Sequence, residues 1–128
     1  MKKLLILLFS LLFLSSPSVF AINVSLSCEA GQVAGDVKTL KHQLYDNIFP
    51  TIVINSQKKE VSYSFLQHER RWDTNLKIID EDESNIVAIN LEDASSTDIF
   101  HFNKEDKTFS LVYVGYYGNT INYGQCFD

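Results

Sequence analysis

Residues 22–28 read INVSLSC, and apolar and polar side chains alternate along this segment. Alternation with a period of two is typical of a half-buried β-strand, because successive side chains point to opposite faces of a sheet. The apolar residues Ile22, Val24 and Leu26 share one face with Cys28, so a strand here would direct the Cys28 thiol towards the core. The only other cysteine, Cys126, lies close to the end of the chain. The fold therefore depends on how these two ends of the chain meet.

The two cysteines predict one disulfide that joins the N-terminal and C-terminal strands. An even number of cysteines in an exported chain most simply forms disulfide bonds. The bridge from Cys28 to Cys126 would close a loop of about 100 residues, and chain-entropy reasoning gives it a stabilisation of up to ~4.7 kcal/mol. We expect the two Cα atoms to lie about 5.5–6 Å apart, as in most disulfides. Free thiols or an intermolecular bridge are the alternatives.

Residues 1–21, MKKLLILLFSLLFLSSPSVFA, have the pattern of a signal peptide. Two lysines precede an apolar run at residues 4–14, and Val19 and Ala21 are small residues that a signal peptidase accepts. The run is shorter than the ~20 residues of a membrane span, so an uncleaved anchor is the less favoured alternative. Residues 22–128 then form a single β-rich domain, exported to the periplasm or the cell exterior, without stable membrane insertion after cleavage.

The exported domain is expected to be an acidic protein. The leader contains two of the 11 basic residues and none of the 16 acidic ones, which leaves a net charge near −7 after its removal. Phosphate binding needs clustered Lys and Arg residues, so nucleic acid is excluded as a partner. A basic protein or a cation is the partner that such a charge favours.

Alternation recurs along the chain and predicts a mainly β fold, an antiparallel meander that closes into a small barrel or folds into a sandwich. Residues 51–66 are expected to form a hairpin around a polar turn. Further strands are expected at residues 76–79, 86–91, 99–102, 108–114 and 120–126. A barrel would leave no free sheet edge, and a disulfide between the first and last strands fits that closure.

One segment departs from the alternation. At residues 36–48 the apolar side chains fall on one helical face, and Asp36 is suited to cap the first turn. A strand would interleave His42 and Asp46 with the leucines, which fits the alternating pattern less well. We therefore predict one short helix near residues 36–48, packed on the sheet.

No pattern in the sequence identifies a catalytic site, a metal site or a cofactor. The three histidines lack the spacing of metal ligands, and no Gly-x-Ser-x-Gly motif is present. We expect a protein that is not an enzyme and that holds neither a metal nor a cofactor. A hydrolase built from paired carboxylates is the less favoured alternative, because the distance between two carboxylates is set by the fold.

Two groups of residues indicate recognition of a partner. Arg70, Arg71 and Trp72 combine side-chain types that are enriched among interface anchors. Tyr116 and Tyr117 lie between two glycines, as expected of an exposed aromatic loop. The alternative is structural: the tryptophan closes one end of the barrel, the arginines pair with nearby acids, and one tyrosine ring covers the sheet edge.

The most concentrated charge in the chain is the run Asp80, Glu81, Asp82 and Glu83. A calcium loop would need a glycine at its turn and a glutamate at its last position, and Asn85 and Leu91 stand there. The run is interpreted as a solvated hairpin tip or as a docking patch for a basic partner.

The layout of leader, early cysteine, acidic β domain and late cysteine resembles that of the periplasmic inhibitors of animal-type lysozyme, which are small barrels that block a cationic enzyme. The resemblance covers the layout and no motif, so it assigns no site residue. We expect a small exported binding protein, an inhibitor or immunity-type module for a cationic protein partner. The alternative is a β-barrel carrier of an apolar ligand, with a cavity lined by aromatic residues such as Phe100, Phe102, Phe109 and Tyr113.

Overall fold

The computed structural model describes residues 20–36, 38–116 and 118–127. Residues 1–19 of the expected signal peptide lie outside this range. The described part contains nine strands and no helix. The strands are β1 (Asn23–Asp36), β2 (His42–Ile48), β3 (Thr51–Asn55), β4 (Glu60–Gln67), β5 (Arg70–Glu81), β6 (Asn85–Asp93), β7 (Ser96–Asn103), β8 (Thr108–Gly115) and β9 (Gly118–Phe127).

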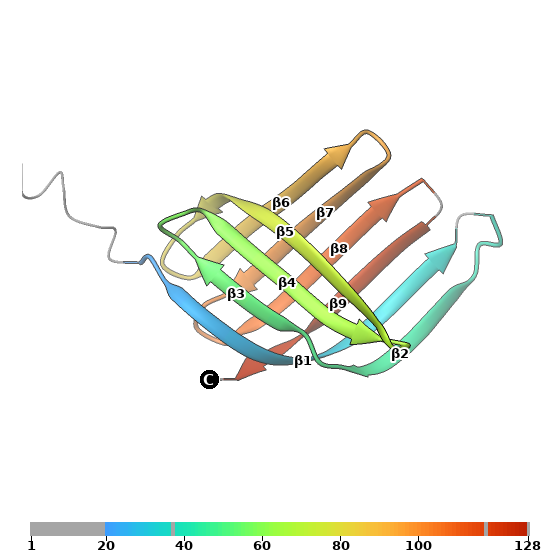
Figure 1. The fold of residues 1–128 in the computed structure, drawn as a ribbon, viewed down its shortest axis with the longest axis horizontal. Coiled ribbons are helices and arrows are strands. Elements are labelled where there is room, and N and C mark those ends of the chain that lie inside the picture. Colours follow the sequence, from blue (N-terminus) through green and yellow to red (C-terminus); the bar gives the residue numbers. More distant parts are fainter. Residues whose placement is uncertain (1–19, 37, 117, 128) are drawn as a thin grey trace, which may run out of the picture.

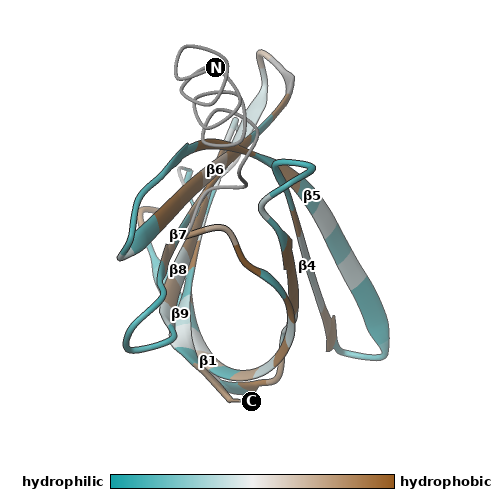
Figure 2. Cartoon of the chain, turned by 90° about the vertical axis from the view of Figure 1, so that its left-hand side faces the viewer, coloured by the Kyte–Doolittle hydropathy of each residue, from teal (hydrophilic) through white to brown (hydrophobic). Residues whose placement is uncertain are grey.

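The strands form one closed antiparallel barrel (Figure 1). From β3 to β9 each strand pairs with the next one in the chain. Strand β1 pairs with β3 through Asn23–Ser27 and with β9 through Ser27–Asp36. The eight strands β1 and β3–β9 therefore close into a ring, and β2 pairs with β1 beside β3. Figure 2 shows these strands arranged around the interior, and the expected barrel is confirmed.

The predicted helix at residues 36–48 is wrong, because this segment forms a hairpin. Asp36 does cap a turn, since its Oδ1 accepts the backbone N–H of Lys38 at 2.7 Å. Leu40 then adopts a left-handed φ of 57°, which ends any helical path. The Asp36 N–H donates to the carbonyl of Lys41 at 3.0 Å and reverses the chain. Strand β2 follows and covers the edge of β1 that β3 leaves free.

The hydrophobic core consists of the inward-facing side chains of the strands. The largest buried side chains are Tyr63, Phe100, Phe102, Ile52 and Ile54. The Tyr63 ring meets the rings of Phe100 and Phe109 edge to face, with centroids 6.4 and 5.7 Å apart. Edge-to-face packing of this kind adds to the burial of apolar area. The apolar residues of the predicted alternation are therefore the side chains that fill the barrel.

The predicted disulfide between Cys28 and Cys126 is confirmed, with an Sγ–Sγ distance of 2.04 Å. The predicted spacing was wrong, because the Cα atoms are 3.9 Å apart. The two residues face each other in the β1–β9 register. The Cys28 N–H donates to Pro50 and the Cys126 N–H to Lys107, so both amides point away from each other. Such non-hydrogen-bonded pairs are where antiparallel strands come closest, at ~4.5 Å between Cα atoms.

Gly124 lies in β9 opposite Ala30 of β1, two residues from the disulfide. A Cβ atom at Gly124 would lie 2.0 Å from the carbonyl oxygen of Glu29 and 2.8 Å from the Cα of Ala30. Both of these are backbone atoms, so no side-chain rotation could relieve the clash. Closure of the barrel therefore needs glycine at this position.

We predict that Gly124→Ala destabilises the barrel, because the added methyl group would push β1 and β9 apart. Overpacking of this kind costs about 1–3 kcal/mol of unfolding free energy. The measurement is urea unfolding of the oxidised protein. Gly35→Ala is the matched control, because a Cβ there would have its nearest neighbour, Asn119 O, at 3.9 Å. Equal stability of the two variants would show that the β1–β9 approach imposes no constraint.

Candidate functional site

The two ends of the barrel differ in structure. One end carries the N-terminal segment and the turns at residues 55–60, 81–85 and 103–108, and we call it the closed end. The other end carries the hairpin tips at residues 36–42, 67–70, 93–96 and 115–118, and we call it the mouth. In Figure 1 the closed end lies on the left and the mouth on the right.

A cavity of about 560 Å³ opens at the mouth. This volume is within the range of about 300–1,000 Å³ that small-molecule sites occupy. The cavity is lined by side chains from β1, β2, β4, β5, β7, β8 and β9, so it is the interior of the barrel and not a surface groove. An eight-stranded barrel has room for its own side chains or for one small ligand.

Aromatic side chains form one wall of the cavity. The rings of Phe65 on β4 and Trp72 on β5 stack, with centroids 6.4 Å apart and an angle of 14° between planes. Phe65 also contacts the core ring of Tyr63, at 5.9 Å between centroids. The Arg70 guanidinium lies 4.7 Å from the centroid of Trp72. The aromatic packing of the core therefore continues to the mouth, where Trp72 is 45% exposed.

Four polar side chains form a hydrogen-bonded chain along the cavity, and all of them line it. The amide of Gln67 donates to Gln32 Oε1 at 3.2 Å, and Gln32 Nε2 donates to Asn122 Oδ1 at 2.8 Å. Asn122 Nδ2 then donates to the Tyr63 hydroxyl at 3.1 Å. Gln32, Asn122 and Tyr63 are buried. Burial raises the pKa of Tyr63, although the Asn122 bond opposes the shift, so the hydroxyl keeps its proton.

The outer part of the β4–β5 hairpin is separated from the neighbouring strands. The β3–β4 ladder ends at Thr51 and Ser64, and the β5–β6 ladder ends at Lys77 and Ile89. Residues 65–76, which we call the outer hairpin, therefore have ladder partners in the described chain only within the β4–β5 pair. The barrel widens at the mouth because this hairpin leaves the sheet on both sides.

Besides the packing of Phe65 and Leu76 on the core, three side-chain contacts among the described residues connect the outer hairpin to the rest of the mouth. The first is the bond from Gln67 to Gln32 in β1. In the second, the His68 ring packs edge-on against Tyr45 at 6.1 Å. In the third, the Thr74 hydroxyl donates to Asp98 Oδ2 on β7 at 3.1 Å. Such a hairpin is expected to open more readily than the fully paired strands.

The tip of the outer hairpin is a two-residue turn formed by His68 and Glu69. Both residues have left-handed backbone angles, with φ of 53° and 63°. A type I′ turn requires positive φ at both central positions and usually contains Asn-Gly. Neither residue type signals this turn, so the sequence did not predict a hairpin here.

The structure brings members of both predicted recognition groups to the mouth. Trp72 lines the cavity, and Arg71 pairs with the cavity residue Asp73 at 3.0 Å. Both partners of that ion pair are exposed, so it contributes little to stability. Tyr116 lies at the β8–β9 tip and is 74% exposed, with its N–H donated to Ser95. Tyr117 lies outside the described residues.

Only Tyr113 of the four aromatic residues named for a carrier lines the cavity. Phe100, Phe102 and Phe109 are buried in the core. The polar chain of Gln67, Gln32, Asn122 and Tyr63 was not predicted. Its one signal in the sequence is that Gln32 and Asn122 occupy inward positions of alternating strands, where apolar residues are expected.

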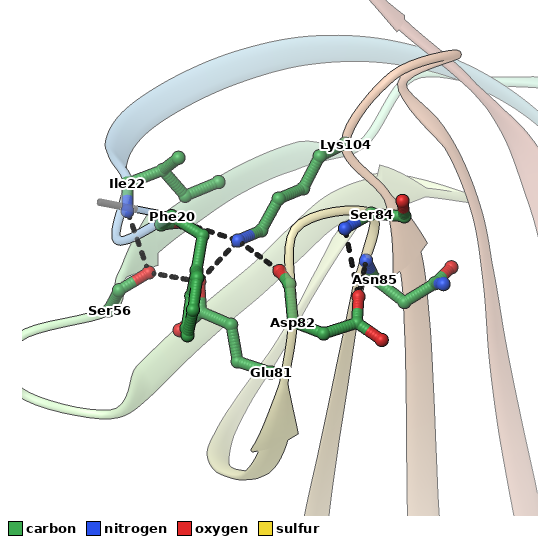
Figure 3. Close-up of polar contacts among 8 residues, drawn as sticks. All are labelled: Phe20, Ile22, Ser56, Glu81, Asp82, Ser84, Asn85 and Lys104. Atoms are coloured by element: carbon green, nitrogen blue, oxygen red, sulfur yellow. Dashed lines mark hydrogen bonds and ion pairs between the residues drawn. The ribbon is translucent and has the colours of Figure 1, made fainter. Parts of the chain in front are cut away.

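The acidic run lies at the closed end, opposite the mouth, and its members have different roles (Figure 3). Glu81 Oε2 accepts the Lys104 ammonium at 2.7 Å and the Ser56 hydroxyl at 2.8 Å. The side chains of Lys104 and Glu81 are only 10% and 13% exposed. The backbone N–H groups of Ser84 and Asn85 donate to Asp82 and lower its pKa. Asp80, Asp82 and Glu83 are exposed, so the run is not a uniform patch.

Comparison with known proteins gives this chain no family. Neither a scan against protein-family models nor a search of curated proteins found a match. Within residues 20–36, 38–116 and 118–127, no group of three His, Cys, Asp or Glu side chains is placed to hold a metal ion. The same residues include no helix long and apolar enough to cross a membrane. Function is therefore argued from the geometry of the two ends of the barrel.

Proposed function

We propose that this protein is a non-enzymatic binding protein that holds a small, mainly apolar molecule in the mouth of its barrel. The observation that supports the proposal is the cavity of about 560 Å³, which has an aromatic wall and a buried polar chain. Ligand sites are commonly apolar cavities with a few fixed polar groups that orient the ligand. The carrier of an apolar ligand, which was the alternative in the sequence analysis, is thus the function that the geometry favours.

The hydrogen-bonding state of Tyr63 indicates which polar group the ligand carries. Its hydroxyl oxygen accepts the Asn122 amide, and no described residue accepts the hydroxyl hydrogen. A hydroxyl is both a donor and an acceptor, so a ligand could accept this hydrogen at the inner end of the cavity. A carbonyl oxygen or an aromatic ring nitrogen of the ligand could act as this acceptor.

The charge around the cavity disfavours an anionic ligand. Asp73 and Asp98 line the mouth, Asp73 being paired with Arg71, and the chain as a whole has a net charge of −5. A carboxylate placed near them would lose its hydration and meet like charge. The expected ligand is therefore a neutral molecule with an apolar, preferably planar body and one acceptor group.

The test compares a neutral aryl ketone with its methylene analogue, which lacks the acceptor. Trp72 is the only tryptophan in the chain, so quenching of its fluorescence reports binding at the mouth. We expect the ketone to bind more tightly than the analogue. Tyr63→Phe should weaken ketone binding about fivefold, as for the loss of one neutral hydrogen bond of ~1 kcal/mol, and should leave the analogue unaffected.

Two further variants complete the test. Tyr123→Phe makes the same chemical change on a tyrosine that is half exposed and outside the cavity, and should change nothing. Ala34→Phe would fill the cavity without removing a hydrogen bond, and should abolish binding. Binding that survives Ala34→Phe, or the failure of both compounds to quench Trp72, would contradict the proposal.

We also propose a second binding surface, for a cationic protein partner, at the closed end. The supporting observation is a backbone hydrogen bond that joins two acidic turns: the backbone N–H of Lys104 donates to the carbonyl of Ser84 at 2.8 Å. The exposed carboxylates of these turns belong to Asp82, Glu83, Glu105 and Asp106. The Lys104 ammonium is directed to Glu81, so it neutralises the exposed group little. An inhibitor or immunity-type role would use this surface.

Animal-type lysozyme is a suitable cationic probe for this surface at low ionic strength, where exposed charges are least screened. Removing two carboxylates with Glu83→Gln and Glu105→Gln should weaken binding about twofold to thirtyfold, at 0.2–1 kcal/mol for each exposed pair. The control removes two exposed carboxylates elsewhere, with Glu29→Gln and Glu69→Gln. Equal weakening by both double variants would mean that only net charge matters. Absence of binding would reject an inhibitor of this class.

A further inference from the structure

Ile22, the residue that follows the expected signal-peptide cleavage point, is held firmly at the closed end (Figure 3). Its N–H donates to Ser56 Oγ at 2.9 Å. In return, the Ser56 N–H donates to the carbonyl of Ile22 at 2.8 Å. The Ile22 side chain packs against the core. The position of the Ile22 nitrogen is therefore fixed by residues that remain after cleavage.

A nearly buried carboxylate, that of Glu81, lies next to this nitrogen. Ser56 Oγ, which accepts from Ile22, donates to Glu81 Oε2 at 2.8 Å. These two bonds limit the distance from the Ile22 nitrogen to Glu81 Oε2 to at most 5.7 Å. No donor in the described chain contacts the second carboxylate oxygen, Glu81 Oε1. Glu81 thus has an acceptor available for a further cation.

In the uncleaved chain, Phe20, which precedes the cleavage point, contacts the neighbouring Lys104. The Lys104 ammonium contacts Glu81, the carbonyl of Asp82 and the carbonyl of Phe20. It also lies 5.3 Å from the centroid of the Phe20 ring. Cleavage after Ala21 would remove Phe20 together with both of its contacts. It would open the cluster next to Glu81 while leaving the Glu81–Lys104 pair in place.

We propose that cleavage between Ala21 and Ile22 creates an α-ammonium group that binds the Ser56–Glu81 pair and so completes the closed end of the barrel. The peptidase adds water across the peptide bond, which leaves a carboxylate on Ala21 and an amine on Ile22 that takes up a proton. The titratable groups around this amine are Glu81 on β5, Asp82 in the following turn and Lys104 in the β7–β8 turn. Of the two carboxylates, that of Glu81 contacts Lys104 and Ser56, whereas that of Asp82 accepts the N–H groups of Ser84 and Asn85.

The proposal gives the N-terminus a defined titration. A carboxylate within this distance favours the charged form of an amine, and the Lys104 ammonium, which contacts the same Glu81 oxygen, opposes it. With Glu81 linked to the amine through Ser56 and Asp82 also ionised, the pKa of the Ile22 α-amino group should still exceed the usual ~7.7–8.0. Because the pKa of this amine is higher in the folded chain than in the unfolded chain, the amine contributes its full stabilisation of the fold below the unfolded pKa. This stabilisation is lost as the pH rises through the folded value.

The experiment uses the full chain, exported and processed by its host, and measures the intact mass and the NMR titration of ¹⁵N-labelled Ile22. We expect an N-terminus at Ile22 and a pKa of its amine above that of the same chain unfolded in urea. Glu81→Gln should return the pKa to the unfolded value. Glu83→Gln removes an exposed carboxylate in the adjacent turn and should leave it unchanged.

Two results would overturn the proposal. One is a mature N-terminus at a residue other than Ile22. The other is an Ile22 amine with the same pKa in the folded and urea-unfolded wild-type chain. This comparison needs no substitution, so it remains decisive if Glu81→Gln fails to fold. Ser56→Ala provides a second variant, in which a smaller rise of the pKa is expected because the bridging hydroxyl is lost.

Discussion

The pairing of β1 with β9 is the constraint on which the rest of the structure depends. It joins the first and last strands of the described chain along a ladder that runs from the pair Ser27 and Phe127 to the pair Asp36 and Gly118. Without it, β1 and β9 would both present open edges. The disulfide fixes this ladder where the two strands come closest, and Gly124 permits the approach. Once the ring is closed, the interior of the barrel has a fixed width. The side chains that point inward then determine whether each end is filled or open.

The two ends of the barrel differ in how their interiors are filled. At the closed end, the interior is filled by aromatic rings, and a nearly buried ion pair joins the β5–β6 and β7–β8 turns. At the mouth, the outer hairpin at residues 65–76 leaves its neighbours, and amide and hydroxyl groups replace core side chains. Polar groups in such a position must be satisfied by one another. The chain from Gln67 to Tyr63 does so.

The sequence predicted the parts of this structure that depend on local pattern. Alternation located the strands other than β2 and the first half of β5, as well as the inward direction of Cys28, and the two cysteines predicted the closure. The helix at residues 36–48 was wrong because the Asp36 cap serves a turn equally well, and only the open edge of β1 selects a strand. The contacts of the site were beyond prediction, since Gln32 and Asn122 meet across 90 residues. Glu81 was recognised only as part of an acidic run, because its partner Lys104 lies on another hairpin.

The central claim is that the β1–β9 closure makes a rigid barrel whose mouth opens at one hairpin. Residue-resolved amide hydrogen exchange tests it most directly, because exchange reports the free energy of local opening. The account predicts the slowest exchange in β1 and β9 around Cys28 and Cys126. It predicts markedly faster exchange in the outer hairpin at residues 65–76, slowed when a ligand occupies the cavity. Equal protection of the outer hairpin and the β1–β9 ladder would contradict the account.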